Sequence, residues 1–381
     1  MNALKQTKNQ LVTLFVLLLI SVQVSATVVQ KKVIMIVSGY GQQQGETAPG
    51  YEFDEFAKAY SVFKANGIVV DIASPNGGKV EADKYDPAKS YNARVLADTA
   101  IMAKLNNTIA TDKLDAKAYD AIFIVGGKGA MFDLPKDEAL KSIIADIYQQ
   151  QGVVAAVCHG PAALVDVKLK DGSYLIANKA INGFTNKEEK LFGKKWLNQF
   201  EFMLEDKLSE RGAKFQSSEI MLSHVAVDGR LVTGQNPTST VNVATELVKL
   251  LGRTPVIDKQ DIEDKTMALI AEFLAGDKLA AKTLAAMKNQ SKGQEQYHLA
   301  LVGMYGFYYV KTAEIDDQFE NALTLMKVAQ KAINNPMLDM QIAQTQHQLG
   351  KASDAKSTLN QLLVAKPDYK PALDMLKTLS M

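Results

Sequence analysis

The stretch VVAAVCHGPAALV, residues 153–165, decides the fold of this chain. Its first five residues are apolar and rich in valine, which is typical of a strand buried on both faces of a parallel sheet. The run stops at Cys158, and Pro161 fits the first turn of a helix, where its missing N–H costs nothing. A strand, a sharp turn with a nucleophile at its tip and a helix make a nucleophile elbow, here with cysteine in place of serine.

The position of Cys158 predicts a reactive thiol. The start of the expected helix carries a partial positive charge, which favours the thiolate and lowers the pKa of the thiol. The next residue, His159, can serve as a base or as a cationic neighbour. The alternative is a buried, inert cysteine, because free cysteine is among the most buried residue types. The strand–turn–helix context favours the reactive thiol.

The composition is that of an ordinary globular protein. The chain has 381 residues, of which 47% are hydrophobic and 22% are charged, and its formal net charge is +1. This length suits two domains, and the near-neutral charge gives no electrostatic case for binding nucleic acid or an anionic membrane surface. One cysteine allows no intrachain disulfide, and the four histidines lack metal-ligand spacing. We therefore expect no metal and no cofactor.

The N-terminus has the pattern of a targeting segment. Two lysines precede an apolar run at 11–22, and small residues occupy cleavage-site positions at 24–26. The run is shorter than the roughly 20 residues needed to span a bilayer. The pattern predicts a cleaved secretory signal over 1–26 and an exported mature chain, periplasmic or secreted, with no membrane attachment. The alternative is an uncleaved anchor.

Four apolar runs predict the parallel strands of an α/β domain. They lie at 33–38, 68–73, 121–125 and 153–157. Helical patterns that begin at Phe53 and at Asp137 connect them in right-handed βαβ units. Glycine loops follow the strands, so the ligand site is expected at the C-terminal edge of the sheet. The predicted fold is a flavodoxin-like parallel sheet sandwiched by helices.

The rest of this domain is expected to hold shorter elements before the composition changes. They are a helix over about 93–105, a short strand at 180–184, a hairpin over 225–233 with Asp-Gly at its turn, and a last helix over about 239–251. Beyond Gly252 the strand patterns end. The predicted α/β domain is 27–252, and a second domain is 253–381.

The second domain is expected to be all α-helical. Its segment 336–369 has 34 residues, the length of a tetratricopeptide unit, and a weaker copy precedes it. The alternative is a generic helical bundle. An aromatic cluster within 305–309 could line a binding groove, but helix–helix core is the favoured interpretation.

A cysteine nucleophile also needs a proton shuttle. Glu55 lies at the start of the first helix, at the loop edge of the sheet, where it can reach Cys158. A buried carboxyl that shares a proton with sulfur would serve as a general acid and base. From spacing alone, Glu52, Asp54 and Glu55 are hard to rank, because acidic residues at a helix start often only complement its dipole.

The remaining groups of the predicted site come from two loops. The backbone N–H groups of Gly127 and His159 would form an oxyanion hole. Gly126 and Lys128, in the same glycine loop, are expected beside the substrate. Glu189 would orient His159 as the third member of a triad.

Six motifs in order resemble one family. They are residues 50–56, YDAIFIVGGKGAMFDLP, VVAAVCHGPAALV, INGFTNKEE, FMLED and VDGRLVTGQNP. Together they are similar to the ThiJ/PfpI superfamily, in its chaperone and glyoxalase III-like branch with a class I glutamine-amidotransferase-like fold. The resemblance covers about 33–252.

The resemblance implies roles for four residues. The acid, five residues after the first motif's glycine, is Glu55; the nucleophile and its neighbour are Cys158 and His159; the third member is Glu189. It implies glutathione-independent conversion of methylglyoxal-type 2-oxoaldehydes to 2-hydroxy acids, by a lyase or hydrolase of glyoxalase III type. Deglycase and holdase roles have also been proposed for the family, stress-response roles are implied with them, and homodimers are common in it.

Two departures leave the substrate range open. Lys128 stands where many relatives carry histidine, and Glu201 stands where many carry proline. His224 occupies a position that is often histidine in relatives, and a structural role is its favoured interpretation.

Three functions compete. The first is an exported 2-oxoaldehyde-converting enzyme whose helical repeats bind a protein partner. The second is a holdase or redox-sensing binding protein, in which Cys158 is oxidised and the helical repeats supply the client surface. The third, a cysteine peptidase or amidotransferase, is the least favoured, because no partner synthase domain is visible in the sequence.

Overall fold

The computed structural model describes residues 30–257, 260–287 and 296–379. Residues Lys31–Met381 form one compact unit. The predicted signal segment, 1–26, lies outside the described residues. Within the described ranges, no helix combines the length and the apolar character needed to cross a membrane.

The first half of the unit is built on a seven-stranded sheet with the order β3-β2-β1-β4-β5-β9-β8. The strands are β1 (Lys32–Ile36), β2 (Val69–Ser74), β3 (Ile109–Ala110), β4 (Ala121–Ile124), β5 (Val153–Val157), β8 (Val225–Asp228) and β9 (Leu231–Gly234). All pairs are parallel except the hairpin of β8 and β9. The predicted flavodoxin-like fold is confirmed, whereas the short edge strand β3 was not predicted.

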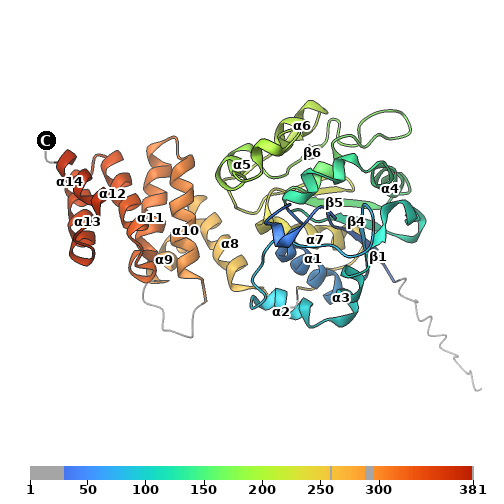
Figure 1. The fold of residues 1–381 in the computed structure, drawn as a ribbon, viewed down its shortest axis with the longest axis horizontal. Helices are drawn as coiled ribbons and strands as arrows, with labels where there is room; N and C mark the ends of the chain where they lie inside the picture. Colours follow the sequence, from blue (N-terminus) through green and yellow to red (C-terminus); the bar gives the residue numbers. More distant parts are fainter. Residues whose placement is uncertain (1–29, 258–259, 288–295, 380–381) are drawn as a thin grey trace, which may run out of the picture. The chain divides into compact units, whose positions relative to one another are not determined.

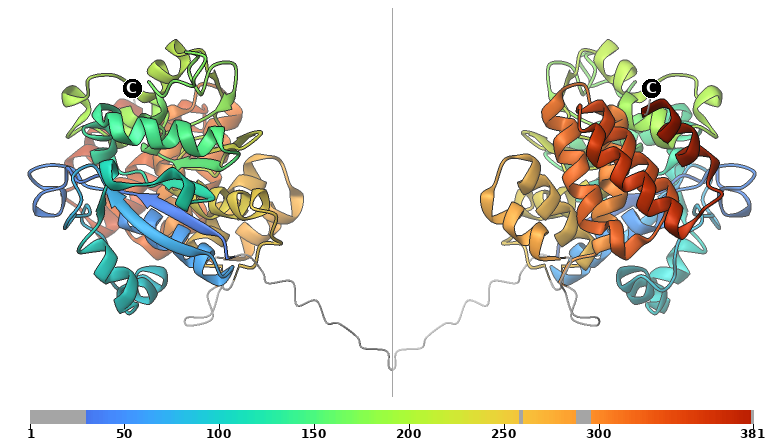
Figure 2. Two further views of the ribbon diagram at one scale, coloured as in Figure 1. Left: turned by 90° about the vertical axis from the view of Figure 1, so that its right-hand side faces the viewer. Right: turned by 90° about the vertical axis from the view of Figure 1, so that its left-hand side faces the viewer.

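Helices cover both faces of this sheet (Figure 1). The chain moves from β1 to β2 in one direction and from β4 to β5 in the other. Right-handed crossovers therefore put α1 (Phe53–Ala65) and α4 (Glu138–Gln149) on opposite faces. The last helix of this half, α7 (Thr240–Leu250), packs beside α1. Figure 2 shows the same layers from the two sides.

The strand register brings the functional loops to one edge. Ile36 of β1 is level with Ile124 of β4, and Ile124 is level with Ala156 of β5. Val157 of β5 is level with Gly234 of β9. The C-terminal ends of these parallel strands therefore meet at the edge where a ligand site was expected.

Two local expectations were wrong. The predicted helix at 93–105 is divided into α2 (Ser90–Leu96) and α3 (Thr99–Leu105), because the Asp98 side chain accepts hydrogen bonds from Ala100 N and Ile101 N and caps a new helix. The segment after the elbow is a five-residue 3₁₀ helix, η6 (Gly160–Leu164), where an α-helix was expected.

The remaining elements of this half are short. β6 (Ala180–Ile181) and β7 (Lys214–Phe215) pair in a separate sheet. Between these two strands the chain forms α5 (Asn186–Phe192) and α6 (Leu204–Glu210). The other 3₁₀ helices are η1 (Gln43–Gly45), η2 (Thr111–Lys113), η3 (Ala116–Ala118), η4 (Lys128–Met131), η5 (Leu134–Lys136), η7 (Leu197–Gln199), η8 (Pro237–Ser239) and, in the second half, η9 (Val310–Thr312).

In the described residues beyond 260 the elements are all helices. They are α8 (Ile262–Leu274), α9 (Lys278–Met287), α10 (Leu299–Tyr309), α11 (Asp316–Ile333), α12 (Pro336–Gln348), α13 (Ala352–Ala365) and α14 (Lys370–Leu379). Helices α12 and α13 pack together and span most of 336–369. Their assignment to a tetratricopeptide repeat, and the domain boundary at 252, stay predictions.

The helical region shares packing with the α/β half. Ile220 and Leu222 belong to the same apolar cluster as Ile270 of α8 and Leu284 of α9. A part-buried ion pair of 2.6 Å joins Lys58 of α1 to Asp264 of α8. The two halves are therefore joined by both apolar and charged contacts.

Candidate active site

Cys158 sits at the tip of a strained elbow directly after β5. Its φ is +60°, a left-handed conformation that is uncommon for a residue with a side chain. Its N–H donates to Gly234 O at 2.8 Å, and its carbonyl accepts from Phe184 N at 2.8 Å. These two bonds hold the strained backbone, and the side chain, only 3% exposed, points into the protein.

His159 connects the thiol to Glu189. Its Nδ1 lies 3.3 Å from Cys158 Sγ, and its Nε2 lies 2.7 Å from Glu189 Oε2. A carboxylate only accepts, so Nε2–H donates to Glu189, and Nδ1 is the ring atom that faces the sulfur. The predicted triad residues therefore lie together.

Helix α5 fixes Glu189 through its N-terminal cap. The Thr185 side chain accepts from Glu188 N, and the Glu188 carboxylate accepts from Thr185 N at 2.9 Å, which completes a capping box. The other oxygen of Glu188 accepts from Gln235, Asn236 and Met221 N at 2.7–3.0 Å. This buried network ties α5 to the loop after β9, a role for Glu188 that the sequence did not reveal.

Glu55 approaches Cys158 from α1. The carboxyl is fully buried, and its Oε2 accepts from Gly126 N at 2.7 Å. Its Oε1 has no hydrogen-bond partner of normal geometry in the described chain. A Cβ on Gly126 would lie 2.7 Å from both Cys158 Cβ and Glu55 Oε2, so only glycine lets these groups come together.

The pKa values of this pair are coupled. Burial raises the pKa of Glu55, and the nearby Glu52 carboxyl raises it further. Burial also raises the pKa of the Cys158 thiol and the charge of Glu55 adds to this, whereas the Lys128 ammonium lowers it. A negative charge on either group raises the pKa of the other. The pair therefore keeps one proton, which either the sulfur or the carboxyl can carry.

The expectation of a lowered thiol pKa was wrong. It assumed an exposed thiol at the start of an α-helix, but Cys158 is buried and precedes a short 3₁₀ helix. Desolvation therefore outweighs the effect of the helix dipole.

The glycine loop lies beside Cys158. Gly126 N–H donates to Glu55. Gly127 has a φ of +94°, and its N–H is directed at the Cys158 sulfur, where it lowers the pKa of the thiol. Lys128 is half-buried at the start of η4, with its charge near Cys158 and Glu52.

Glu52 is a further titratable group that sequence reasoning did not assign. Burial, Asp54 and Asp83 raise its pKa to about 7, against the opposing charge of Lys128. In the sequence, Glu52 could be noticed only because it lies three residues before Glu55. Acidic residues are common at helix starts, so this position alone does not predict a raised pKa.

Two aromatic rings lie beside His159. The Phe184 ring lies 4.5 Å from the His159 ring, and the Phe200 ring lies 6.3 Å from it. Elsewhere, the exposed Lys195 Nζ donates to Glu46 O at 2.8 Å and so joins the loop before η7 to the loop after η1.

Three further residues named from the sequence make contacts with other parts of the protein. Glu201 forms an exposed 2.6 Å ion pair with Lys136. Asn236 caps η8, as expected for a turn. His224 donates its backbone N–H to Ser239, and burial lowers the pKa of its ring. Among the described residues, no group of three His, Cys, Asp or Glu side chains is placed to hold a metal ion.

Residues 47–250 match the model of the DJ-1/PfpI family, more than half of the chain. The chain belongs to the DJ-1/PfpI family. It is 32% identical over 236 residues to the glutathione-independent glyoxalase hsp3101 of Schizosaccharomyces pombe, covering 58% of this chain and 95% of that protein. It is 36% identical over 198 residues to glyoxalase 3 of Candida albicans, covering 50% of this chain and 84% of that protein.

Solved structures of the family agree with this membership. The crystal structure of glyoxalase III from Candida albicans aligns with a TM-score of 0.54 at 27% identity, covering 58% of this chain and 97% of that one. The 24 kDa rapid encystment protein of Francisella tularensis aligns with a TM-score of 0.54 at 34% identity, covering 58% and 99%. The family match ends at residue 250, so the helices α8 to α14 lie outside it.

Proposed function

We propose that this protein converts small 2-oxoaldehydes of the methylglyoxal type to 2-hydroxy acids without glutathione. The observation that carries the proposal is the placement of the lone thiol, Cys158, between the buried Glu55 carboxyl and an imidazole oriented by Glu189. One relative named as a glutathione-independent glyoxalase and another named glyoxalase 3 support a glyoxalase activity.

The first step forms a hemithioacetal. The form of the pair that reacts has the thiolate on Cys158 and the proton on Glu55. The sulfur attacks the aldehyde carbon, C1, and forms the S–C1 bond, while the aldehyde oxygen takes the proton from Glu55. Gly127 N–H, directed at the sulfur, can donate to the oxygen as its charge develops.

The second step moves two protons. His159 Nδ1 takes the proton from C1 and delivers it to C2. Glu55, now a carboxylate, takes the proton from the oxygen on C1 and delivers it to the oxygen on C2. The product is a 2-hydroxy thioester on Cys158, an isomer of the hemithioacetal, and no oxidant is needed.

The third step releases the acid. Water adds its oxygen to C1, the C1–S bond breaks, and the sulfur leaves as thiolate. The second proton of the water returns to Glu55, which restores the starting pair. The net reaction adds one water to the oxoaldehyde, so the enzyme would be classed as a hydro-lyase, with hydrolysis of a thioester as its last step.

The direct experiment incubates the full chain with methylglyoxal, without glutathione, and measures lactate. We expect turnover by the native protein and by Glu201→Gln, which alters only an exposed carboxyl, and none by Cys158→Ala. Equal lactate formation by the native protein and Cys158→Ala would overturn the proposal.

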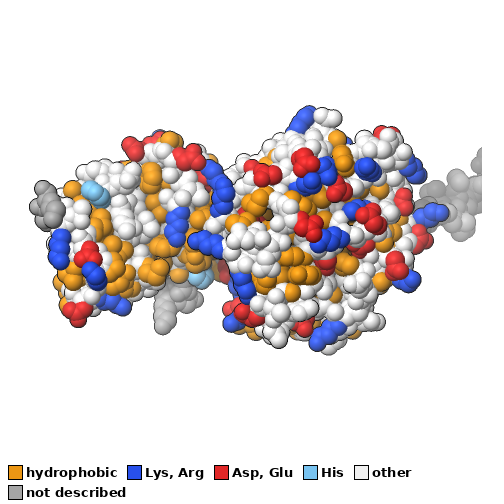
Figure 3. All heavy atoms as spheres, turned by 45° about the horizontal axis from the view of Figure 1, so that its top comes forward, with side chains coloured by type: hydrophobic (Ala, Val, Ile, Leu, Met, Phe, Trp, Pro, Cys, Tyr) orange, Lys and Arg blue, Asp and Glu red, His pale blue; other side chains and the backbone are white. Residues whose placement is uncertain are grey.

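The second candidate function is a holdase for unfolded proteins, favoured by exposed apolar side chains on the helical region (Figure 3). Leu279, Ile315, Met337 and Val364 are 73%, 60%, 61% and 85% exposed. This function would survive Cys158→Ala and decline when Met337 and Val364 are replaced by serine, as measured by light scattering of an aggregating client. In this function the helical region would supply the surface that binds the protein partner, and the protein would act after export.

A further inference from the structure

Helix α5 ends at a buried glycine beside the Glu189 carboxylate. Gly193 directly follows Phe192, the last residue of α5, and its φ is −88°. Residues with side chains adopt a negative φ freely, so the backbone conformation does not require a glycine at this position. The requirement for glycine therefore comes from the space around it.

A side chain at residue 193 would occupy the place of the Glu189 carboxylate. The three atoms nearest to an added Cβ all belong to Glu189: Oε1 at 1.7 Å, Cδ at 2.6 Å and the carbonyl oxygen at 2.8 Å. Non-bonded carbon atoms pack about 3.5–4.0 Å apart. Even one methyl group at residue 193 and the carboxylate in its present position therefore exclude each other.

The backbone at residue 193 is held by hydrogen bonds on both sides. Gly193 N donates to Glu189 O at 2.7 Å. The carbonyl oxygen of Gly193 accepts from Trp196 N at 2.8 Å and from Leu197 N at 3.0 Å. Moving this backbone away from Glu189 would break these bonds.

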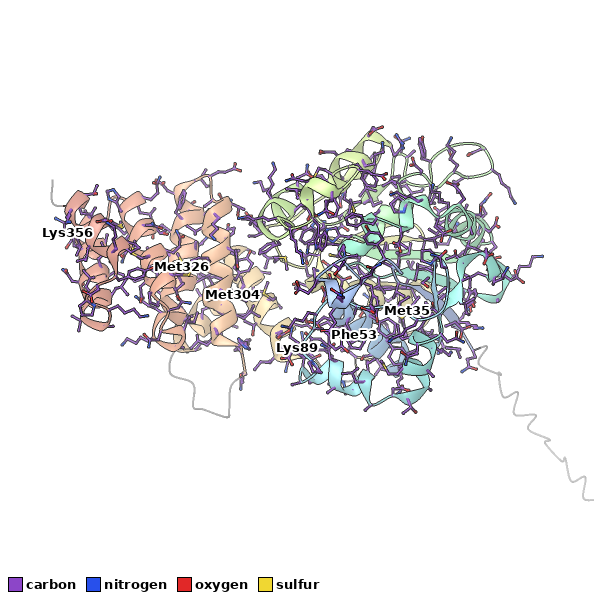
Figure 4. The ribbon with its side chains drawn as sticks, in the orientation of Figure 1. Met35, Phe53, Lys89, Met304, Met326 and Lys356 are labelled. Carbon is purple, nitrogen blue, oxygen red and sulfur yellow. The ribbon has the colours of Figure 1, made fainter. Side chains whose placement is uncertain are left out.

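The residue before Gly193 is anchored by the helical region. The Phe192 ring packs edge to face on the Tyr308 ring of α10, with centroids 5.0 Å apart. In Figure 4, α10 is the helix that carries the label Met304. With the backbone fixed in these two ways, an added methyl group would displace the Glu189 carboxylate.

One oxygen of the Glu189 carboxylate is held by packing alone. Oε1 is buried and has no hydrogen-bond partner among the described residues, whereas Oε2 lies 2.7 Å from His159 Nε2. The neighbouring Glu188 differs, because both of its oxygens accept hydrogen bonds. Since no donor retains Oε1 of Glu189, a methyl group in its place would turn the carboxylate, and Oε2 would leave His159.

We propose that Gly193 is a positioning residue for His159. Because it has no side chain, Glu189 Oε1 can lie against the end of α5 while Oε2 accepts from Nε2–H, which keeps Nδ1 facing the Cys158 sulfur. Gly193→Ala should therefore act as a loss of Glu189 and lower kcat on the order of 10²-fold. The effect on kcat rests on the proposed function, whereas the loss of the bond between Glu189 and His159 does not.

The direct test is the NMR signal of the His159 Nε2 proton in the full chain. A charge-assisted hydrogen bond is short, and its proton resonates downfield. We expect a downfield signal, absent from His159→Gln, in the native protein and in Gly39→Ala, where an added Cβ meets nothing closer than 3.8 Å. The signal should move upfield or disappear in Gly193→Ala, as in Glu189→Gln. An unchanged signal in Gly193→Ala, or no such signal in the native protein, would overturn the proposal whether or not methylglyoxal is turned over.

Double variants separate positioning from general damage. If Gly193 acts through Glu189, Gly193→Ala should cause no further loss of kcat in the Glu189→Gln background. The effect of Gly193→Ala on thermal unfolding should likewise shrink in the Glu189→Ala background, where the carboxylate is gone. This comparison holds even if the single variant folds poorly. Losses that add fully in both backgrounds would show a purely structural role and contradict the assignment.

Discussion

The α/β half and the helical half of this protein contribute in different ways. The first contains the thiol, both carboxyls and the imidazole of the candidate site, and the relatives described above match it over 84–99% of their own length. The family fold is therefore complete without the second half. Yet the second half contacts the two helices that carry the carboxyls.

These contacts are specific. On α1, Lys58 pairs with Asp264 one turn after Glu55. On α5, which carries Glu189, Phe192 packs on Tyr308 and Lys187 pairs with Glu314 at 2.9 Å. An appended region can therefore be structurally coupled to a site to which it contributes no reacting group. We expect the chemistry to depend on the first half and the coupling to depend on both halves.

The largest effect is expected from Glu55→Gln. The amide cannot hold and return a proton, so kcat should fall by about 10²–10⁴ with little change in stability. Lactate formation and chemical denaturation would be measured beside Glu201→Gln as the control. If Glu55→Gln kept its turnover, another group would transfer the proton. Glu55 would then no longer be evidence that the first half supplies the chemistry.

Glu189→Gln should have the next largest effect. The amide can still contact His159 but does not stabilise its cation or select its tautomer, so kcat should fall on the order of 10²-fold. The measurement is the dependence of kcat on pH. If Glu189 had a purely structural role, Glu189→Gln would keep the pH profile of the native protein. An unchanged profile would show that His159 needs no orienting carboxylate.

The coupling itself is tested by Lys58→Met. This change leaves the part-buried Asp264 carboxylate without its partner, so the free energy of unfolding should fall by about 1–3 kcal/mol. The double variant with Asp264→Leu should recover most of the loss, because it removes both charges. Denaturant titration of the full chain decides, and a single variant as stable as the native chain would show that the pair contributes nothing.

The smallest effect concerns Glu52 and pH. Its pKa of about 7 in the folded protein lies above its ordinary value of 4.5, so the folded state binds more protons between these limits. Stability should therefore decline as pH rises from about 4.5 to about 7, by on the order of 1 kcal/mol after solvent screening. Glu52→Gln should lack this decline, and a decline of equal size in both proteins would assign it elsewhere.

The sheet could be predicted because its strands are buried on both faces. For a continuous apolar run such as 153–157, a central strand of a parallel sheet buries the most apolar surface. The observed strand β5 has the same bounds as this run. The two-residue β3 could not be predicted, since it pairs only through Ile109 and Ala110 at the sheet edge. The break at Asp98 was present in the sequence as a capping residue but was hidden by apolar residues on both sides.

The site could be predicted only as a set of residues. Cys158 and the three residues proposed as its partners lie together because the sheet register brings the elbow and its neighbouring loops to one edge. The use of Gly126 N–H by Glu55 and the raised thiol pKa depend on burial and on hydrogen bonds from other loops. A linear pattern does not contain these quantities, nor the space that Gly193 leaves for the Glu189 carboxylate.

The most direct test of the central claim is peptide mass mapping of the full chain, quenched with acid during turnover of methylglyoxal. Because Cys158 is the only cysteine, we expect an adduct with the mass of one methylglyoxal on that residue, together with lactate in solution. Lactate formation with no such adduct, persisting in Cys158→Ala, would contradict it.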